Sequence, residues 1–217
     1  MTAKRYIQIP RGYLSHSQRE LWKRSREEYA RRYFDGEPGF STPAMEYGKI
    51  VADALEAEQE TGDLLTDSAL LLLPKYDIRD QAFTVEVRTK DGWLVLLAKP
   101  DYMQSDTYDF IEVKTGKQPW TQARAEAHPQ LLFYATCIWQ KYGVMLEWAK
   151  LAWVETEWIR PFDKSEAEVR PTGRVETFEV PFTKAQYYET LADMTKTAKE
   201  IEIAWAAHVT PEYIKTF

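Results

Sequence analysis

The middle of the chain alternates hydrophobic and polar residues with a period of two, as β-strands do. Phe83, Val85 and Val87 alternate with polar residues, and Asp91-Gly92 behind them favours a tight hairpin turn. The segment after this turn is again rich in apolar residues, and further short apolar runs follow it. The pattern predicts strands over residues 82–90, 93–98, 108–114, 146–155 and 175–180.

Segments in which apolar residues recur every three or four positions flank these strands. Ser15 and Ser17 each precede a Gln or Glu by three residues, as in a capping box, so the first helix is expected to begin at one of them. Thr42-Pro43 is a suitable start for a second helix. The first helix is predicted to end at about residue 34, and the second at about residue 62. The pattern also predicts a short helix or buried segment over 63–73, and helices over 119–142 and 183–208.

This order of elements indicates an α/β fold in which a central mixed sheet is flanked by helices, with N-terminal helices and a C-terminal helix. The 217 residues are enough for one domain with a substantial core. We expect a single domain over residues 1–217. Its parts are an N-terminal helical segment at 14–73, a core at about 83–155, and a C-terminal strand and helix at 174–208.

Charge is distributed unevenly along the chain. The net charge is −6 at pH 7, yet residues 1–36 hold nine Lys and Arg against four Asp and Glu. A basic first helix can attract phosphate groups, and aromatic rings can stack on bases; a solvated helix face with its own charge pairs is the alternative. The expected nucleic-acid contacts are Arg19, Trp22, Lys23, Arg24, Arg26 and Trp120.

The cysteine content and the hydropathy of the chain exclude two classes of protein. The single cysteine, Cys137, rules out disulfides within the chain and any metal cluster held only by cysteines. The longest apolar run, residues 69–74, is too short to span a bilayer, and the N-terminus lacks the apolar segment of a signal peptide. We therefore expect a cytoplasmic protein with no membrane partner.

Two acidic residues and a lysine stand near the ends of the predicted strands. Asp101 follows the hairpin, while Glu112 and Lys114 lie two residues apart in the next strand, so both point to one side and Val113 to the other. Such a group can hold a divalent cation and position a water beside it, as metal-assisted phosphodiester hydrolysis requires. A surface pair between Lys114 and Glu112 is the alternative.

A later helix adds polar residues that can reach the same place. Gln130 and Tyr134 lie one helical turn apart in a mostly apolar segment, so they face one direction; ordinary amphipathicity is the alternative. The three histidines show no metal-binding spacing, and we interpret His128 as structural or solvent-facing.

Taken in order, these motifs resemble the RecB-like nuclease branch of the PD-(D/E)XK superfamily. The likeness rests on the hairpin, on Pro100-Asp101, on Phe110-Ile-Glu-Val-Lys-Thr-Gly116, and on Gln130 with Tyr134. It extends to the segments around Ser15 and Tyr47-Gly48 in the first two helices, and so covers most of residues 13–143. The resemblance implies a restriction-endonuclease-like core.

The resemblance also implies a role for each matching residue. Asp101, Glu112 and the Val113 carbonyl would bind Mg²⁺ or Mn²⁺, and the cation would keep both carboxylates ionised at pH 7. Lys114 would orient and help activate the attacking water.

Gln130 would hold the site geometry or a DNA phosphate, and Tyr134 would support its helix or contact DNA. Small nucleases of this kind often belong to phages or mobile elements. The resemblance implies that the protein binds DNA, and that it has a protein partner in recombination or repair.

The chain departs from this family in two places. Members often carry a His or Glu at the position of Ala52, so Asp53 or Glu46 would have to supply that ligand if the register of the second helix differs. Iron–sulfur members have four cysteines, but Ser25 stands near the first such position and Cys137 is alone, which excludes an iron–sulfur cluster.

These observations lead to three hypotheses. The first is a metal-dependent DNA nuclease, of the exonuclease or recombination and repair type rather than a restriction enzyme. The second is a catalytically weak or inactive nuclease fold that binds nucleic acid or a protein partner, which the alanine at position 52 favours. The third is an α/β protein in which the Glu-x-Lys motif is incidental.

Overall fold

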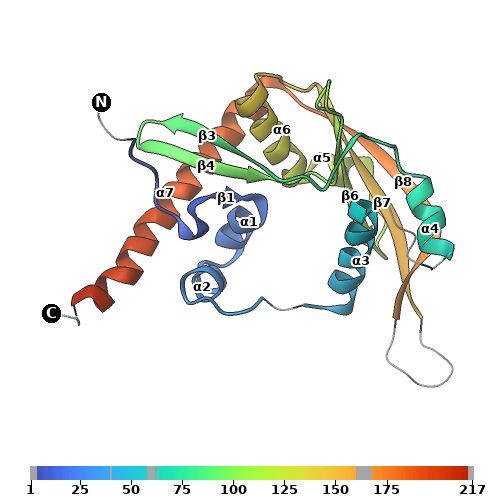
Figure 1. Ribbon diagram of the computed structural model, residues 1–217, viewed down its shortest axis with the longest axis horizontal. Helices are drawn as coiled ribbons and strands as arrows, with labels where there is room; N and C mark the ends of the chain where they lie inside the picture. Colours follow the sequence, from blue (N-terminus) through green and yellow to red (C-terminus); the bar gives the residue numbers. More distant parts are fainter. Residues whose placement is uncertain (1–3, 40, 58–61, 63, 160–167, 215–217) are drawn as a thin grey trace.

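The computed structural model describes residues 4–39, 41–57, 62, 64–159 and 168–214 (Figure 1). Helices surround two mixed β-sheets, so the predicted α/β class is confirmed. The strands form two sheets, because the hairpin belongs to a sheet of its own.

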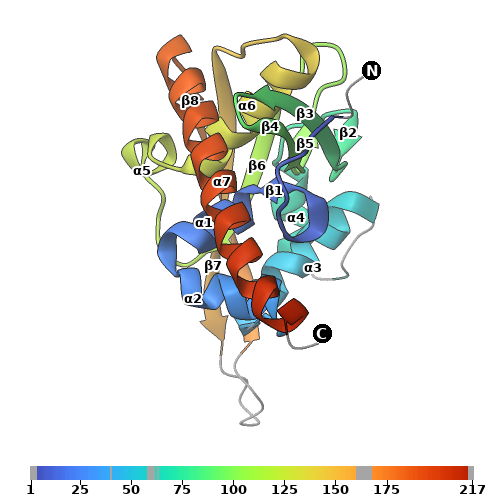
Figure 2. The same cartoon turned by 90° about the vertical axis from the view of Figure 1, so that its left-hand side faces the viewer.

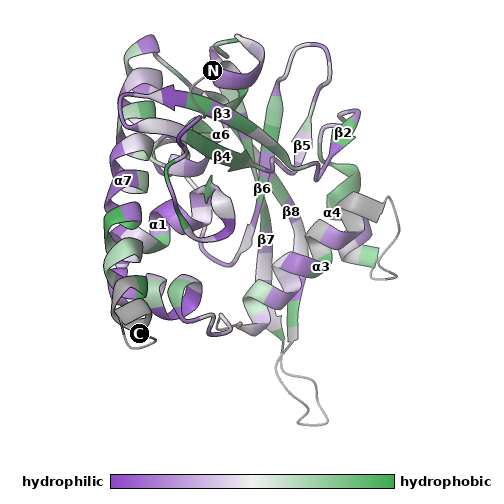
Figure 3. Ribbon diagram, turned by 60° about the vertical axis from the view of Figure 1, so that its left-hand side comes forward, coloured by the Kyte–Doolittle hydropathy of each residue, from purple (hydrophilic) through white to green (hydrophobic). Residues whose placement is uncertain are grey.

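The smaller sheet has three strands in the order β1-β4-β3. As predicted, β3 (Phe83–Thr89) and β4 (Gly92–Ala98) form an antiparallel hairpin, but its two-residue turn is Lys90-Asp91 rather than Asp91-Gly92, because Thr89 pairs with Gly92. The short β1 (Leu14–Ser15), which the sequence pattern did not indicate, pairs with β4 in parallel. Hydrophobic residues are concentrated in β4 (Figure 3), where Leu94, Leu96 and Ala98 are fully buried.

The larger sheet has five strands in the order β2-β5-β6-β7-β8. The pair β6–β7 is parallel and the other pairs are antiparallel, with a bulge in the long β7–β8 ribbon between Val154 and Thr156. Strands β6, β7 and β8 were predicted, whereas the two-residue strands β2 and β5 were not. The strands are β2 (Ile78–Arg79), β5 (Tyr102–Met103), β6 (Phe110–Gly116), β7 (Trp148–Ile159) and β8 (Glu168–Pro181).

The N-terminal helical segment begins as predicted but is divided. The Ser15 hydroxyl accepts a hydrogen bond from the Gln18 N–H at 3.3 Å and caps α1. Ser25 then adopts an extended conformation, ends α1, and caps a second short helix by accepting from the Glu28 N–H. The prediction of one helix to Phe34 was therefore wrong. The elements are η1 (Pro10–Gly12, a 3₁₀ turn), α1 (His16–Arg24), α2 (Arg26–Tyr29) and η2 (Ala30–Phe34, a π-helical turn).

The next two helices agree with the sequence pattern. Thr42 caps α3 (Pro43–Ala57) by accepting a hydrogen bond from the Met45 N–H at 3.2 Å. The predicted short helix is α4 (Leu64–Leu71), and both helices lie over the larger sheet beside β8 (Figure 1).

The helix predicted over residues 119–142 is broken in two. It forms α5 (Gln122–Glu126) and α6 (Pro129–Tyr142). His128 stands between them with extended backbone, because a residue before proline is disfavoured in the helical region. As predicted, Gly143 ends α6, in a left-handed conformation.

The final helix, α7 (Lys184–Ile214), runs along the molecule and packs on α1 and α6 (Figure 2). Its inward face contributes Tyr187, Met194, Ala198 and Ile201 to the main hydrophobic core. None of the helices in the described part of the chain combines the length and apolar character that a bilayer crossing requires.

We predict that Gly92→Ala lowers the stability of the protein by about 1–3 kcal/mol. Gly92 has a φ of +137°, and a Cβ there would lie 2.7 Å from the carbonyl oxygen of Arg5, on the segment that pairs with the hairpin. Gly116→Ala is the matched control, because its Cβ would meet nothing within 4 Å. Chemical denaturation measures both, and equal stabilities of the two variants would contradict the prediction.

Candidate active site

Strand β6 divides its side chains between two hydrophobic clusters. Phe110 belongs to the main core, and Glu112 shares its face of the strand. Ile111 and Val113 point to the opposite face, into a second cluster that includes Tyr47 and Tyr102. The predicted alternation is therefore confirmed. It leaves the Glu112 side chain only 4% exposed, next to the core.

Lys114 connects the carboxylate on β6 with the start of α6. Its ammonium donates to Glu112 Oε1 and to Gln130 Oε1, each at 2.7 Å. The Gln130 amide in turn donates to the Tyr134 hydroxyl at 2.8 Å. The structure thus brings together Glu112, Lys114, Gln130 and Tyr134, four of the residues singled out in the sequence, in one hydrogen-bonded chain.

Asp101 reaches the same strand from the segment just before β5. Its Oδ2 accepts a hydrogen bond from the Val113 N–H at 2.6 Å. Because the N–H and C=O of one strand residue point to the same edge of the strand, the Val113 carbonyl also faces the edge where Asp101 lies. Glu112 and the Val113 carbonyl of β6, together with Asp101 beside that strand, are therefore candidate oxygen ligands for a cation.

Burial determines the protonation of the two carboxyl groups. Desolvation, and then the nearby Asp101, raise the pKa of Glu112 to about 8, although Lys114 opposes this shift. Desolvation also raises the pKa of Asp101. Without a bound cation, Glu112 is therefore mostly protonated at pH 7. This differs from the sequence expectation, which assumed a cation beside both groups.

A third carboxylate that the sequence analysis missed lies beside these two. Asp80 follows β2, donates its backbone N–H to the Asp101 carbonyl at 2.8 Å, and forms an ion pair with Lys99 at 2.5 Å. Its side chain is only 10% exposed, and its charge contributes to the raised pKa of both Asp101 and Glu112. Its φ of +43° is unusual for a residue with a side chain. No periodic pattern or motif marks this position in the sequence.

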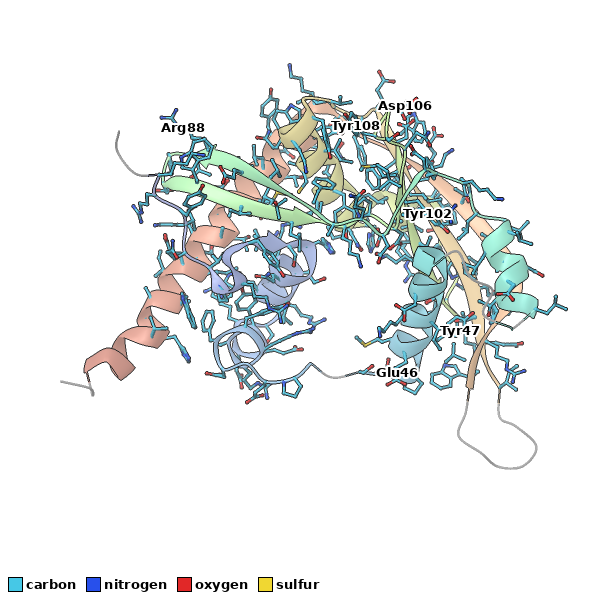
Figure 4. All side chains as sticks on the ribbon, viewed as in Figure 1. Glu46, Tyr47, Arg88, Tyr102, Asp106 and Tyr108 are labelled. Atoms are coloured by element: carbon cyan, nitrogen blue, oxygen red, sulfur yellow. The ribbon has the colours of Figure 1, made fainter. Side chains whose placement is uncertain are left out.

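Helix α3 approaches the site through its glycine. A Cβ on Gly48 would lie 3.3 Å from the Thr115 hydroxyl at the end of β6. The acids proposed as extra ligands point elsewhere: Glu46 is exposed near the outer end of α3 (Figure 4), and Asp53 is 61% exposed beside Lys49. The side chain of Ala52 lies outside the described residues. Within the described part of the chain, no three His, Cys, Asp or Glu residues form a metal-binding group.

Several basic residues of α1 and α2 form ion pairs with α7. Arg19, with a 9% exposed side chain, contacts both Asp193 and Glu20, and Lys23 donates to Asp193 at 2.7 Å. Arg26 forms an ion pair with Glu200 at 2.9 Å. These charges hold the N-terminal helices against α7, so burial of Arg19 does not fit its predicted nucleic-acid role.

The two tryptophans expected to stack on bases are also held inside the fold. Trp22 is 4% exposed and its indole N–H donates to Glu200 at 3.0 Å. Trp120 is 9% exposed, with the Arg124 guanidinium over its ring. Neither placement fits base stacking. Arg24 remains 71% exposed beside Glu28, and its contact with nucleic acid stays a prediction.

Two of the histidines lie beside the lysine end of the site. His16 and His128 have ring centroids 6.2 Å apart, and both pack against aromatic rings. Burial lowers the pKa of His16 to about 3 and that of His128 to about 4, with the Lys114 charge adding to both shifts. Both are therefore neutral at pH 7, which agrees with the structural interpretation of His128.

Comparison with solved structures finds the same fold in several proteins, which include the following three. The first is a candidate exonuclease from Eubacterium rectale, with a TM-score of 0.55 and 12% identity over 89% of this chain and 82% of that one. The second is an alkaline exonuclease from Laribacter hongkongensis, with a TM-score of 0.51 and 14% identity over 96% of each chain. The third is a phage-related exonuclease from Haemophilus somnus 129PT, with a TM-score of 0.51 and 12% identity over 94% and 92%.

At these identities the likeness establishes a shared fold. Comparison with protein-family models and with curated proteins finds no match. The fold agrees with the PD-(D/E)XK resemblance, whereas the RecB-like branch stays a prediction.

We predict that the stability of the metal-free protein carries a component that falls as pH rises from about 4.5 to about 8. In this range the unfolded chain loses the Glu112 proton while the folded chain retains it, so raising the pH favours unfolding. This component should disappear in Glu112→Gln. The difference in free energy of unfolding between wild type and this variant should therefore change by more than ~1 kcal/mol from one end of this pH range to the other. Thermal unfolding in EDTA at several pH values measures it.

Glu189→Gln, at an exposed position on α7, is the matched control. If Glu112→Gln and Glu189→Gln show the same pH dependence, Glu112 is not protonated in the folded protein.

Proposed function

We propose that this protein is a divalent-metal-dependent deoxyribonuclease that degrades DNA from an end. The observation that carries the proposal is the contact of Lys114 with both Glu112 and Gln130, beside the carboxylate of Asp101. A lysine and two carboxylates at one strand end are suited to phosphodiester hydrolysis. The proposal of an exonuclease is supported by the three proteins of the same fold, which are named exonucleases.

The donor atoms of the site fit Mg²⁺ or Mn²⁺. Glu112 Oε2 is buried and has no hydrogen-bond partner among the described residues, which is costly for a carboxylate oxygen unless a cation or water satisfies it. Asp101 and the Val113 carbonyl supply further oxygens at the same strand edge, and hard cations prefer such ligands. Asp101, Glu112 and Val113 would hold the cation, with water and substrate in the other positions.

When bound, such a cation would offset the charge that develops on the phosphate during hydrolysis. The residues of the chain have separate tasks. Lys114 presents ammonium protons next to the carboxylates, where they can orient a water or a phosphate oxygen. Gln130 Oε1 accepts a hydrogen bond from this ammonium, and so holds the lysine in place. Tyr134 accepts from the Gln130 amide, and so fixes the orientation of that amide.

A binding module without catalysis is the second candidate function. The observation that favours it is the position of Glu46 and Asp53, since both side chains are exposed rather than directed to the buried carboxylates. In that case the protein would bind DNA in the presence of Mn²⁺ but leave it intact.

We predict that the wild-type protein degrades linear duplex DNA with Mn²⁺ and that Lys114→Ala and Asp101→Asn each lower the rate by about 100-fold or more. Both variants lose groups that contact the reacting centre. EDTA should abolish cleavage, and a covalently closed circle should resist it. Gel electrophoresis of end-labelled DNA provides the measurement.

Lys117→Ala and Asp106→Asn are matched controls at exposed positions; Figure 4 shows Asp106 at the outer edge of the molecule. DNA binding without cleavage by the wild-type protein would favour the binding module. Cleavage of closed circles at the rate of linear DNA would contradict the end dependence.

We also predict that Glu112→Gln weakens Mn²⁺ binding by about 10-fold or more, because it replaces a charged ligand by a neutral amide. Titration calorimetry, or electron paramagnetic resonance of free Mn²⁺, measures this without any substrate. Glu126→Gln, at an exposed position on α5, should bind Mn²⁺ like the wild type. Equal affinities in all three proteins would exclude Glu112 as a ligand.

A further inference from the structure

A groove of about 590 Å³ lies between the tip of the β3–β4 hairpin and one face of α7. Residues 87–91 form the hairpin side, and none of the groove residues belongs to the candidate active site. Figure 4 labels Arg88 at the outer end of the hairpin, far from Tyr102, which follows Asp101. The groove is therefore a separate surface, and its role does not depend on the proposed nuclease activity.

The floor of the groove is a stripe along one face of α7, which has apolar residues at both ends and Thr195, Lys196, Lys199 and Glu200 between them. The residues that line it recur every three or four positions from Tyr188 to Ile203, so they occupy one face of the helix over about 22 Å, or four turns. Leu191 and Ala192 lie on this stripe. Ile203 is 61% exposed and Tyr188 is 49% exposed, although solvent is unfavourable for such side chains.

The rim of the groove is positively charged, in contrast to the chain as a whole. Arg88, Lys90 and Lys196 are exposed and form no ion pair within the part of the chain that the structure describes. Of the two acids that line the groove, Glu200 is engaged by Trp22 and Arg26, which leaves Asp91 to oppose three cations. An occupant with negative charge is therefore favoured.

We propose that this groove binds an acidic amphipathic helix of a protein partner. The apolar side chains at the two ends of this four-turn stripe match apolar side chains at the two ends of one face of a helix, as in helix-in-groove recognition. The cations on the rim match acidic residues beside that face. A nucleic acid fits less well, because Leu191 and Ile203 offer no ring for stacking and the Tyr188 ring already packs against Trp139.

The test uses the full chain and three fluorescein-labelled peptides of about 16 residues. The first is a Glu-rich helix with Leu on one face, the second has Lys in place of Glu, and the third has the composition of the first with Leu scrambled. We expect the first to bind with a dissociation constant on the order of 10 µM by fluorescence anisotropy, and more weakly at high salt. The other two should bind at least about tenfold more weakly.

Variants locate the binding surface. Lys196→Glu and Ile203→Asp should each weaken binding of the first peptide by about tenfold, whereas Lys184→Glu, at an exposed position of α7 outside the groove, should not. Amide chemical-shift changes should be confined to residues 87–91 and to the groove face of α7. DNA cleavage should be the same in all three variants, which separates this proposal from the proposed function.

Four outcomes would overturn the proposal. They are no binding of the acidic peptide, equal binding of the Lys-rich peptide, shift changes outside the groove, and the same shift changes produced by a single-stranded oligonucleotide in place of the acidic peptide. Sedimentation of the free protein tests for a second copy in the groove. Self-association that Ile203→Asp abolishes would assign the groove to that copy instead.

Discussion

The structure depends on strand β6, which is buried on both faces. Because successive side chains alternate, Phe110 joins one hydrophobic cluster and Ile111 the other, and the register of the whole strand is thereby determined. A slip by one residue would place Glu112 in the second cluster and move Ile111 to the face of the main core. The same packing that stabilises the sheet therefore determines which side of it carries Glu112 and Lys114. Their approach to Gln130 follows from the position of α6 over that side.

Those features that arise from local interactions could be predicted from the sequence. The capping side chains of Ser15 and Thr42 act on backbone groups three residues away, and the hairpin follows from a period of two and a turn that needs glycine. The Glu-x-Lys spacing was sufficient to place both side chains on one face. The Gln-x-x-x-Tyr spacing placed Gln130 and Tyr134 on one face of α6, and the hydrogen bond between them is in accord with this.

The remaining features depend on contacts between distant segments. Strands β2 and β5 have two residues each, too few to show a period, and they exist because β6 offers an edge. Asp80 lies beside Asp101 only because β2 pairs with β5. The basic residues of α1 and α2 suggested a surface for nucleic acid, since their partners on α7 are at least 170 positions away in sequence. The local sequence pattern therefore shows the basic side chains but not their acidic partners on α7.

The hydrogen bond between Asp101 and the Val113 amide has a consequence for the choice of cation. One carboxylate oxygen of Asp101 accepts the backbone N–H, so the other oxygen is the freer one for the proposed ion. Ca²⁺ takes six to eight oxygens and readily uses both oxygens of a carboxylate, whereas Mg²⁺ requires six at short distance and keeps several waters. A carboxylate restrained in this way is better matched to the smaller ion. In the proposed metal site, the backbone of β6 would thus contribute to metal selectivity through a hydrogen bond that does not touch the metal.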